Sequence, residues 1–104
     1  MAKKILIIDD SALMRRVISD IIKTNKQYEV ADFARDGLEG FDRIVSHPKM
    51  YDAIILDINM PKMNGLELLE MLQKNHIQET VIVVSTVAKE GAKETIKALE
   101  LGAF

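Results

Sequence analysis

The chain of 104 residues has the length of one domain, and its content of 48% hydrophobic and 29% charged residues is that of a soluble globular protein. The net charge of −2 provides no general attraction to nucleic acid or to anionic lipid, so we expect neither as a partner. Because the sequence has no cysteine, disulfides, thiol catalysis and thiolate metal sites are excluded.

A short apolar run near the N-terminus superficially resembles a signal peptide. Lys3 and Lys4 precede the apolar residues 5–8, which stop at Asp9. Four residues are too few for the hydrophobic region of a signal peptide or for a membrane span. We therefore expect a cytoplasmic protein that does not insert into a membrane.

Three apolar runs and one weaker stretch of alternating polarity, at residues 28–34, alternate with four helical patterns along the chain. Strands are predicted at residues 4–10, 28–34, 51–57 and 81–85, and helices at 11–23, 36–47, 64–72 and 92–103. Residues 53–56 are continuously apolar, which is typical of a strand buried on both faces of a sheet. The alternation predicts an α/β fold with right-handed crossovers, in which helices cover both faces of a doubly wound parallel sheet.

Three of the predicted helices begin with a recognisable cap. Ser11 can cap the first, Asp36 followed by Glu39 has the pattern of a capping box, and Asn64 with Glu67 can cap the third. In the first helix, six apolar residues recur at three- and four-residue spacing and predict an amphipathic helix. They are Leu13, Met14, Val17, Ile18, Ile21 and Ile22.

Polar side chains follow three of the strands at their carboxyl ends. Asp9 and Asp10 end the first strand, Asp57 ends the third, and Ser85 with Thr86 ends the fourth. If these strands are neighbours, three carboxylates share one crevice at the sheet edge. Two like charges about 5 Å apart repel by roughly 3 kcal/mol at an effective dielectric constant of about 20. An oxygen-only site of this kind favours Mg²⁺, or Mn²⁺ as its substitute.

A carboxylate beside a divalent ion can also attack a phosphoryl group and form an aspartyl phosphate, with the metal and a hydroxyl stabilising the phosphoryl oxygens. Each residue also has a plainer interpretation. Asp9 and Asp10 are common types of helix cap, Asp57 can cap a turn before Pro61, and Ser85 and Thr86 are ordinary at a strand end. Because acids or hydroxyls follow three strands that end at the same edge of the sheet, a functional site is favoured over these separate roles.

These residues resemble the receiver domain of bacterial two-component response regulators over the whole chain. The motifs are the acid pair after the first strand, D-x-N-M-P-x-M-x-G around the third and the hydroxyls after the fourth. The resemblance implies a flavodoxin-like strand order of 2-1-3-4, with Asp57 as the phosphoacceptor. It also implies that Asp9, Asp10, Asp57 and the backbone carbonyl of Asn59 hold Mg²⁺, and that a histidine kinase is the phosphodonor. By the same resemblance, Ser85 would take the role of the hydroxyl that contacts the phosphoryl group and moves on activation, and Pro61 and Gly65 match the family's loop.

The segments DDSALMRRVISDII and VSTVAKEGAKETIKALELGAF are more narrowly similar to the regulatory domain of chemotaxis protein-glutamate methylesterases. In that family, phosphorylation of the receiver relieves its block on a C-terminal esterase domain. The resemblance therefore implies a regulatory domain, non-enzymatic by itself, whose methylesterase-like output domain lies in a parent protein.

Members of the family continue into a fifth strand, a lysine that pairs with the acids and a fifth helix, none of which has a counterpart in residues 1–104. We therefore expect a C-terminally incomplete receiver of four βα units, slow to be phosphorylated. Its fourth strand would be an exposed edge, which favours self-association through edge pairing or an exchanged element.

Two other functions remain open. A phosphohydrolase that uses an aspartyl phosphate normally has a second acid two residues after its nucleophile, where this chain has Asn59. A receiver-like interaction module that is never phosphorylated is the other alternative.

Overall fold

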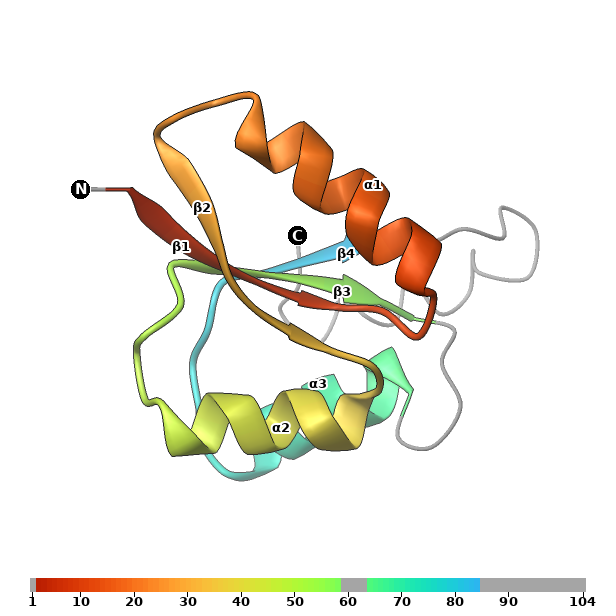
Figure 1. Ribbon diagram of the computed structural model, residues 1–104. Helices are drawn as coiled ribbons and strands as arrows, with labels where there is room; N and C mark the ends of the chain where they lie inside the picture. The colour runs from red at the N-terminus through yellow and green to blue at the C-terminus, as the bar shows by residue number, and fades with distance from the viewer. Residues whose placement is uncertain (1, 59–63, 85–104) are drawn as a thin grey trace.

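A computed structural model describes residues 2–58 and 64–84 of the chain. Within them, strands and helices alternate from the N-terminus (Figure 1). The elements are β1 (Lys3–Ile8), α1 (Ala12–Lys23), β2 (Tyr28–Ala34), α2 (Gly37–Ser46), β3 (Ala53–Asp57), α3 (Gly65–Lys74) and β4 (Val81–Val84). The predicted helix at 92–103 lies outside the described residues.

The four strands form one parallel sheet in the order β2-β1-β3-β4. This confirms the predicted α/β class and the flavodoxin-like order 2-1-3-4. The register pairs Ile8 of β1 with Leu56 of β3, and Asp57 of β3 with Val84 of β4. The carboxyl ends of these three strands therefore meet at one edge of the sheet.

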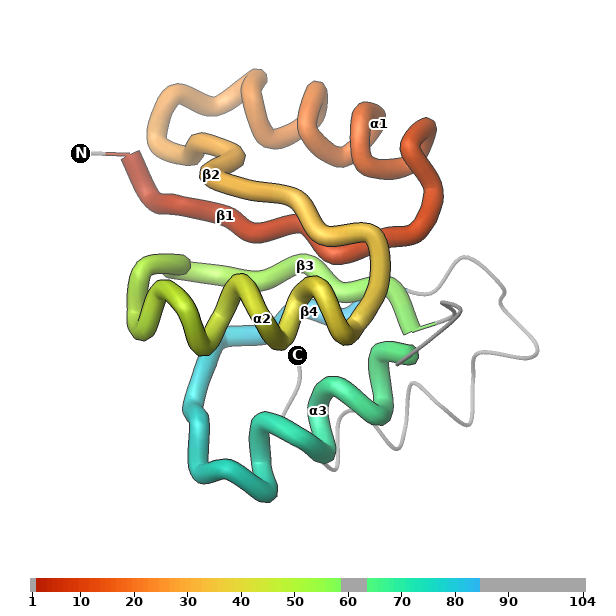
Figure 2. The backbone as a smooth tube through the Cα atoms, turned by 60° about the horizontal axis from the view of Figure 1, so that its bottom comes forward, coloured from red at the N-terminus to blue at the C-terminus, as the bar shows by residue number. Residues whose placement is uncertain are grey.

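The helices cover the sheet from both sides. Figure 1 shows α1 on one face and α2 with α3 on the other, and the rotated view in Figure 2 shows the same layers. Side chains of β1 and β3 that point towards α2 and α3 are fully buried, and they pack with apolar residues of those helices. This core includes Leu6, Ile8, Ile44, Ile54, Leu56, Leu68 and Leu72.

The helix caps are close to those predicted. The Ser11 hydroxyl accepts a hydrogen bond of 3.2 Å from the Met14 N–H, and Asn64 with Glu67 forms a reciprocal capping box. At α2, the Asp36 carboxylate caps the helix by accepting from the Glu39 N–H over 2.8 Å. The Glu39 side chain, however, accepts from the N–H of Arg35, one residue before the cap, so this box is not reciprocal in the predicted way.

The predicted limits of the strands differ slightly from the observed ones. β1 ends at Ile8 and β3 begins at Ala53, because Asp9 and Tyr51 belong to the connecting turns. In α1, half of the predicted apolar stripe is exposed. Leu13 is 71% and Ile21 is 65% exposed, because α1 packs against β1 and β2 through its other side.

No helix in residues 2–58 or 64–84 is long and apolar enough to cross a membrane.

Candidate functional site

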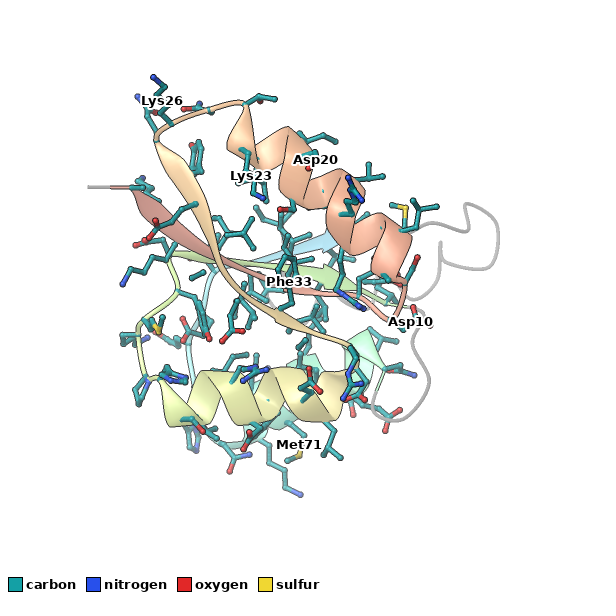
Figure 3. The ribbon with its side chains drawn as sticks, viewed as in Figure 1. Asp10, Asp20, Lys23, Lys26, Phe33 and Met71 are labelled. Carbon is teal, nitrogen blue, oxygen red and sulfur yellow. The ribbon has the colours of Figure 1, made fainter. Side chains whose placement is uncertain are left out.

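Three carboxylates meet at the carboxyl edge of the sheet. Asp9 and Asp10 follow β1, and Asp57 is the last residue of the adjacent strand β3. One oxygen from each of the three side chains can be chosen so that all three lie within 4.8 Å of one another. Figure 3 labels Asp10 at this edge, where β1 turns into α1. The sequence-based prediction that these acids converge is therefore confirmed.

The backbone around Asp9 is held by several hydrogen bonds. Its N–H donates to the carbonyl of Ala34 over 3.0 Å, and its Oδ1 accepts from the Ser11 N–H over 2.9 Å. The guanidinium of Arg15 donates to its backbone carbonyl over 2.7 Å. The interpretation of Asp9 or Asp10 as the cap of α1 is wrong, because Ser11 occupies that position. Asp9 is instead fixed with its carboxylate at the sheet edge.

The electrostatics of the cluster favour a positive partner. Asp9 is only 2% exposed and Asp57 4%, whereas Asp10 is exposed to solvent. Burial raises the pKa of Asp9 above its usual range, and the negative charge of Asp10 raises it further. The Ser11 N–H and the charge of Arg15 act in the opposite direction. The carboxylate form of Asp9 is therefore less favourable than in water, and a cation would stabilise it.

A divalent cation fits this set of donors. Within the described residues, Asp9 Oδ2 is the one buried side-chain oxygen or nitrogen that has no hydrogen-bond partner. Mg²⁺ binds oxygen ligands at about 2.1 Å, so that opposite ligands lie about 4.2 Å apart. The limit of 4.8 Å in the cluster is close to that separation. Small side-chain shifts would therefore bring the three carboxylates to one ion.

The start of α3 packs tightly against the end of β3. The Gly65 N–H donates to the carbonyl of Ile58 over 3.0 Å. A Cβ atom on Gly65 would lie 2.8 Å from the carbonyl oxygen of Asp57 and 2.8 Å from the Cα of Ile58. Only glycine permits this approach of helix to strand, which fixes the backbone that carries Asp57.

Asn59, Pro61, Ser85 and Thr86 lie outside the described residues. The last described residue of β4, Val84, is paired with Asp57 across the sheet. The predicted roles of Ser85, Thr86 and the Asn59 carbonyl therefore stay predictions.

Arg15 is a residue of the site that the sequence analysis did not identify. It lies on the first turn of α1, four residues after the cap Ser11, and its side chain reaches back to the carbonyl of Asp9. The sequence shows only a long basic side chain in the first turn of a helix that follows an acid pair. This pattern is weak evidence for a site residue, because an arginine on a solvated helix face has the same pattern.

Comparison with known proteins identifies the family to which this fold and acidic cluster correspond. A family model described as the response regulator receiver domain matches residues 5–104. The chain is 44% identical, over 97% of its length, to the protein-glutamate methylesterase/protein-glutamine glutaminase of Pyrococcus horikoshii. It spans only 27% of that relative.

Two solved structures are similar in fold and sequence. The response regulator domain of Thermotoga maritima CheB has a TM-score of 0.85 and 41% identity, covering 99% of this chain and 75% of that one. CheY in a CheX–CheY–BeF3–Mg²⁺ complex from Borrelia burgdorferi also has a TM-score of 0.85, at 29% identity, covering 97% of this chain and 73% of that one. On the family match, the strand order and the acidic cluster, this chain belongs to the response regulator receiver domain family.

Proposed function

We propose that this chain is the phosphoacceptor switch of a two-component phosphorelay and that Asp57 receives the phosphoryl group. The observation that carries the proposal is the placement of Asp57. It is a buried carboxylate at the carboxyl end of β3, with oxygens of Asp9 and Asp10 within 4.8 Å. In open α/β sheets this edge is where ligands bind.

Asp9, Asp10 and Asp57 would hold Mg²⁺, or Mn²⁺ in its place, together with the backbone carbonyl of Asn59. The orphaned Oδ2 of Asp9 supports this assignment, because a buried carboxylate oxygen without a partner is costly unless a ligand completes it. A bound divalent ion supplies positive charge that offsets the repulsion between the carboxylates and the phosphoryl oxygens.

The reaction we propose is transfer from a phosphohistidine of a histidine kinase. A carboxylate oxygen of Asp57 attacks phosphorus, the P–N bond breaks, and the histidine nitrogen keeps the electron pair and takes up a proton. Asp57 then carries about two negative charges in place of one. Ser85, with Thr86 beside it, would contact the phosphoryl oxygens through a hydroxyl, and the movement of Ser85 would alter the surface.

The output of the switch is proposed from the relatives. The Pyrococcus horikoshii protein carries the name of a methylesterase, and this chain corresponds to about a quarter of it. We propose that the receiver regulates a methylesterase-like output domain of a chemotaxis protein and has a regulatory rather than enzymatic role by itself.

The test is to incubate the protein with Mg²⁺ and a small-molecule phosphodonor such as acetyl phosphate and then to measure its intact mass. We expect a phosphoryl adduct that depends on Mg²⁺ and is absent in Asp57→Asn. Steady release of phosphate from many organic phosphates would instead indicate a phosphohydrolase. Absence of both the adduct and Mg²⁺ binding would indicate an interaction module.

A further inference from the structure

A groove with a volume of about 710 Å³ runs between α1, β2 and α2, and five of its eleven lining residues are arginine or lysine. We call it the basic groove and define it by Arg15, Arg16, Lys23, Phe33, Arg35 and Arg43. Figure 3 labels Lys23 on α1 and Phe33 on β2. Because the whole chain has a net charge of −2, this concentration of cations is a local feature.

Two of the acids in the basic groove are already neutralised by neighbours. The Asp32 carboxylate accepts a hydrogen bond of 3.1 Å from the Tyr51 hydroxyl and lies 3.6 Å from Arg43 Nε. Glu39 forms an ion pair of 3.2 Å with Arg35. These acids therefore do little to cancel the remaining positive charge.

Arg15 keeps its charge but is held by the backbone carbonyl of Asp9, so Arg16 and Lys23 provide the charge that an occupant can bind. Neither side chain forms an ion pair or a hydrogen bond within the described part of the chain. They are seven residues apart on α1, which is about 10 Å along the helix axis. Asp20 is the one further acid that lines the groove, so two unpaired cations face one acid.

The outer edge of β2 is not open to an added strand at Phe33. The Phe33 N–H donates to Asp32 Oδ1 over 3.0 Å, and its carbonyl accepts from Arg43 Nε over 3.3 Å. A bulge at Ala31 also interrupts the regular register of β2 with β1, which pairs Ile5 with Val30 and then Leu6 with Asp32. An occupant would therefore be recognised by side chains and not by backbone pairing.

We propose that the basic groove is a docking surface for an acidic, extended segment of a partner protein. Its carboxylates would pair with Arg16 and Lys23, and an apolar side chain would pack on Phe33, which is 39% exposed. In a polyproline II helix, acidic residues three positions apart lie on the same side of the peptide, about 9 Å from each other. This is close to the separation of Arg16 and Lys23 along α1. Two unpaired cations suit a short acidic peptide better than a nucleic acid or a membrane, which need a broader positive surface.

The probe is a fluorescein-labelled decapeptide with glutamates three residues apart and a central phenylalanine, titrated with the 104-residue chain and followed by fluorescence anisotropy. The test variant is the double change Arg16→Glu and Lys23→Glu. The control is Lys3→Glu with Lys74→Glu, which alters the net charge equally on residues outside the basic groove. Circular dichroism checks that each variant is folded, and Arg16→Gln with Lys23→Gln serves as a milder second variant.

We expect saturable binding that weakens by about tenfold or more in the test variant, changes little in the control and decreases with salt. A peptide with serine in place of the phenylalanine should bind more weakly. Equal loss of binding in both double variants would overturn the proposal. So would the absence of peptide binding, or tighter binding of a labelled oligonucleotide or of anionic vesicles at the same residues.

Discussion

The guanidinium of Arg15 donates a hydrogen bond of 2.7 Å to the backbone carbonyl of Asp9. This contact joins the first turn of α1 to the acidic end of β1, so the helix helps to fix the carboxylate that follows the strand. The neighbouring Arg16 makes no such contact, although the two residues look equivalent in sequence.

Arg15→Met should therefore lower the free energy of unfolding by about 1 kcal/mol, because the Asp9 carbonyl loses its charged donor. Urea denaturation measures the change. Arg16→Met is the matched control, and as a surface change it should alter stability by less than about 0.5 kcal/mol. Equal effects of the two substitutions would show that the hydrogen bond does not stabilise the fold.

Asp9→Asn should remove the response of the protein to Mg²⁺. At a Mg²⁺ concentration ten times the dissociation constant, the original protein should gain about 1.4 kcal/mol of stability, and the variant should gain almost none. Thermal unfolding with and without Mg²⁺ gives both values. The exposed Asp20→Asn is the control and should respond to Mg²⁺ like the original protein. If Mg²⁺ stabilises Asp9→Asn as much as the original protein, Asp9 is not a ligand of the metal.

Without divalent ions, the same Asp9→Asn change should stabilise the protein by about 1 kcal/mol or more, because one of three neighbouring negative charges disappears. The amide oxygen of asparagine can still accept from the Ser11 N–H, so the local turn is kept. A loss of stability under these conditions would mean that repulsion within the cluster is weaker than its geometry indicates.

Gly65→Ala should destabilise the protein by about 1 to 3 kcal/mol, since the new methyl group meets backbone atoms of Asp57 and Ile58 that cannot move aside. Gly40→Ala is the comparison. There the new methyl group meets the end of the Ile8 side chain, and the higher helix propensity of alanine, about 1 kcal/mol, offsets part of the cost. Chemical denaturation of both variants should rank Gly65→Ala as the more harmful, and the reverse order would contradict the tight approach of α3 to β3.

Much of this arrangement could be predicted from the sequence, as the strands show. β2 matches its predicted range, and the acids after β1 and β3 converge because parallel strands end at the same edge of a sheet. The α1 stripe was less predictable. Periodicity marks Leu13 and Ile21 as apolar, but which side of a helix contacts the sheet depends on how the whole helix is docked.

The contact between Arg15 and Asp9 and the orphaned oxygen of Asp9 could not be predicted either. Both depend on the exact course of the turn between β1 and α1, which composition and spacing do not determine. Likewise, Asp32 and Tyr51 are far apart in the sequence and meet only in the folded chain.

The hydrogen bond between the Tyr51 hydroxyl and the Asp32 carboxylate leads to a prediction of pH dependence. Burial, followed by the charge of Asp32, raises the pKa of Tyr51 from 10.0 to about 12. Between these two values the unfolded chain releases the tyrosine proton while the folded chain keeps it, so stability should fall as the pH rises from 10 to 12. Tyr51→Phe cannot titrate here, and it should be less stable at neutral pH by about 1 kcal/mol because the hydrogen bond to Asp32 is lost. The difference in unfolding free energy between the two proteins should shrink over that range and then reverse, because two pKa units correspond to roughly 2.7 kcal/mol. A constant difference would contradict the raised pKa.

Asp57 is the proposed carrier of the phosphoryl group, and locating the modified residue shows whether it is. The protein is incubated with Mg²⁺ and acetyl phosphate, treated with borohydride to reduce any acyl phosphate to the alcohol, digested, and sequenced by mass spectrometry. We predict that residue 57 is found as homoserine in a fraction of the peptides and that Asp9 and Asp10 remain aspartate. Reduction at Asp9 or Asp10 instead, or at no residue, would contradict the assignment of Asp57 as the phosphoacceptor.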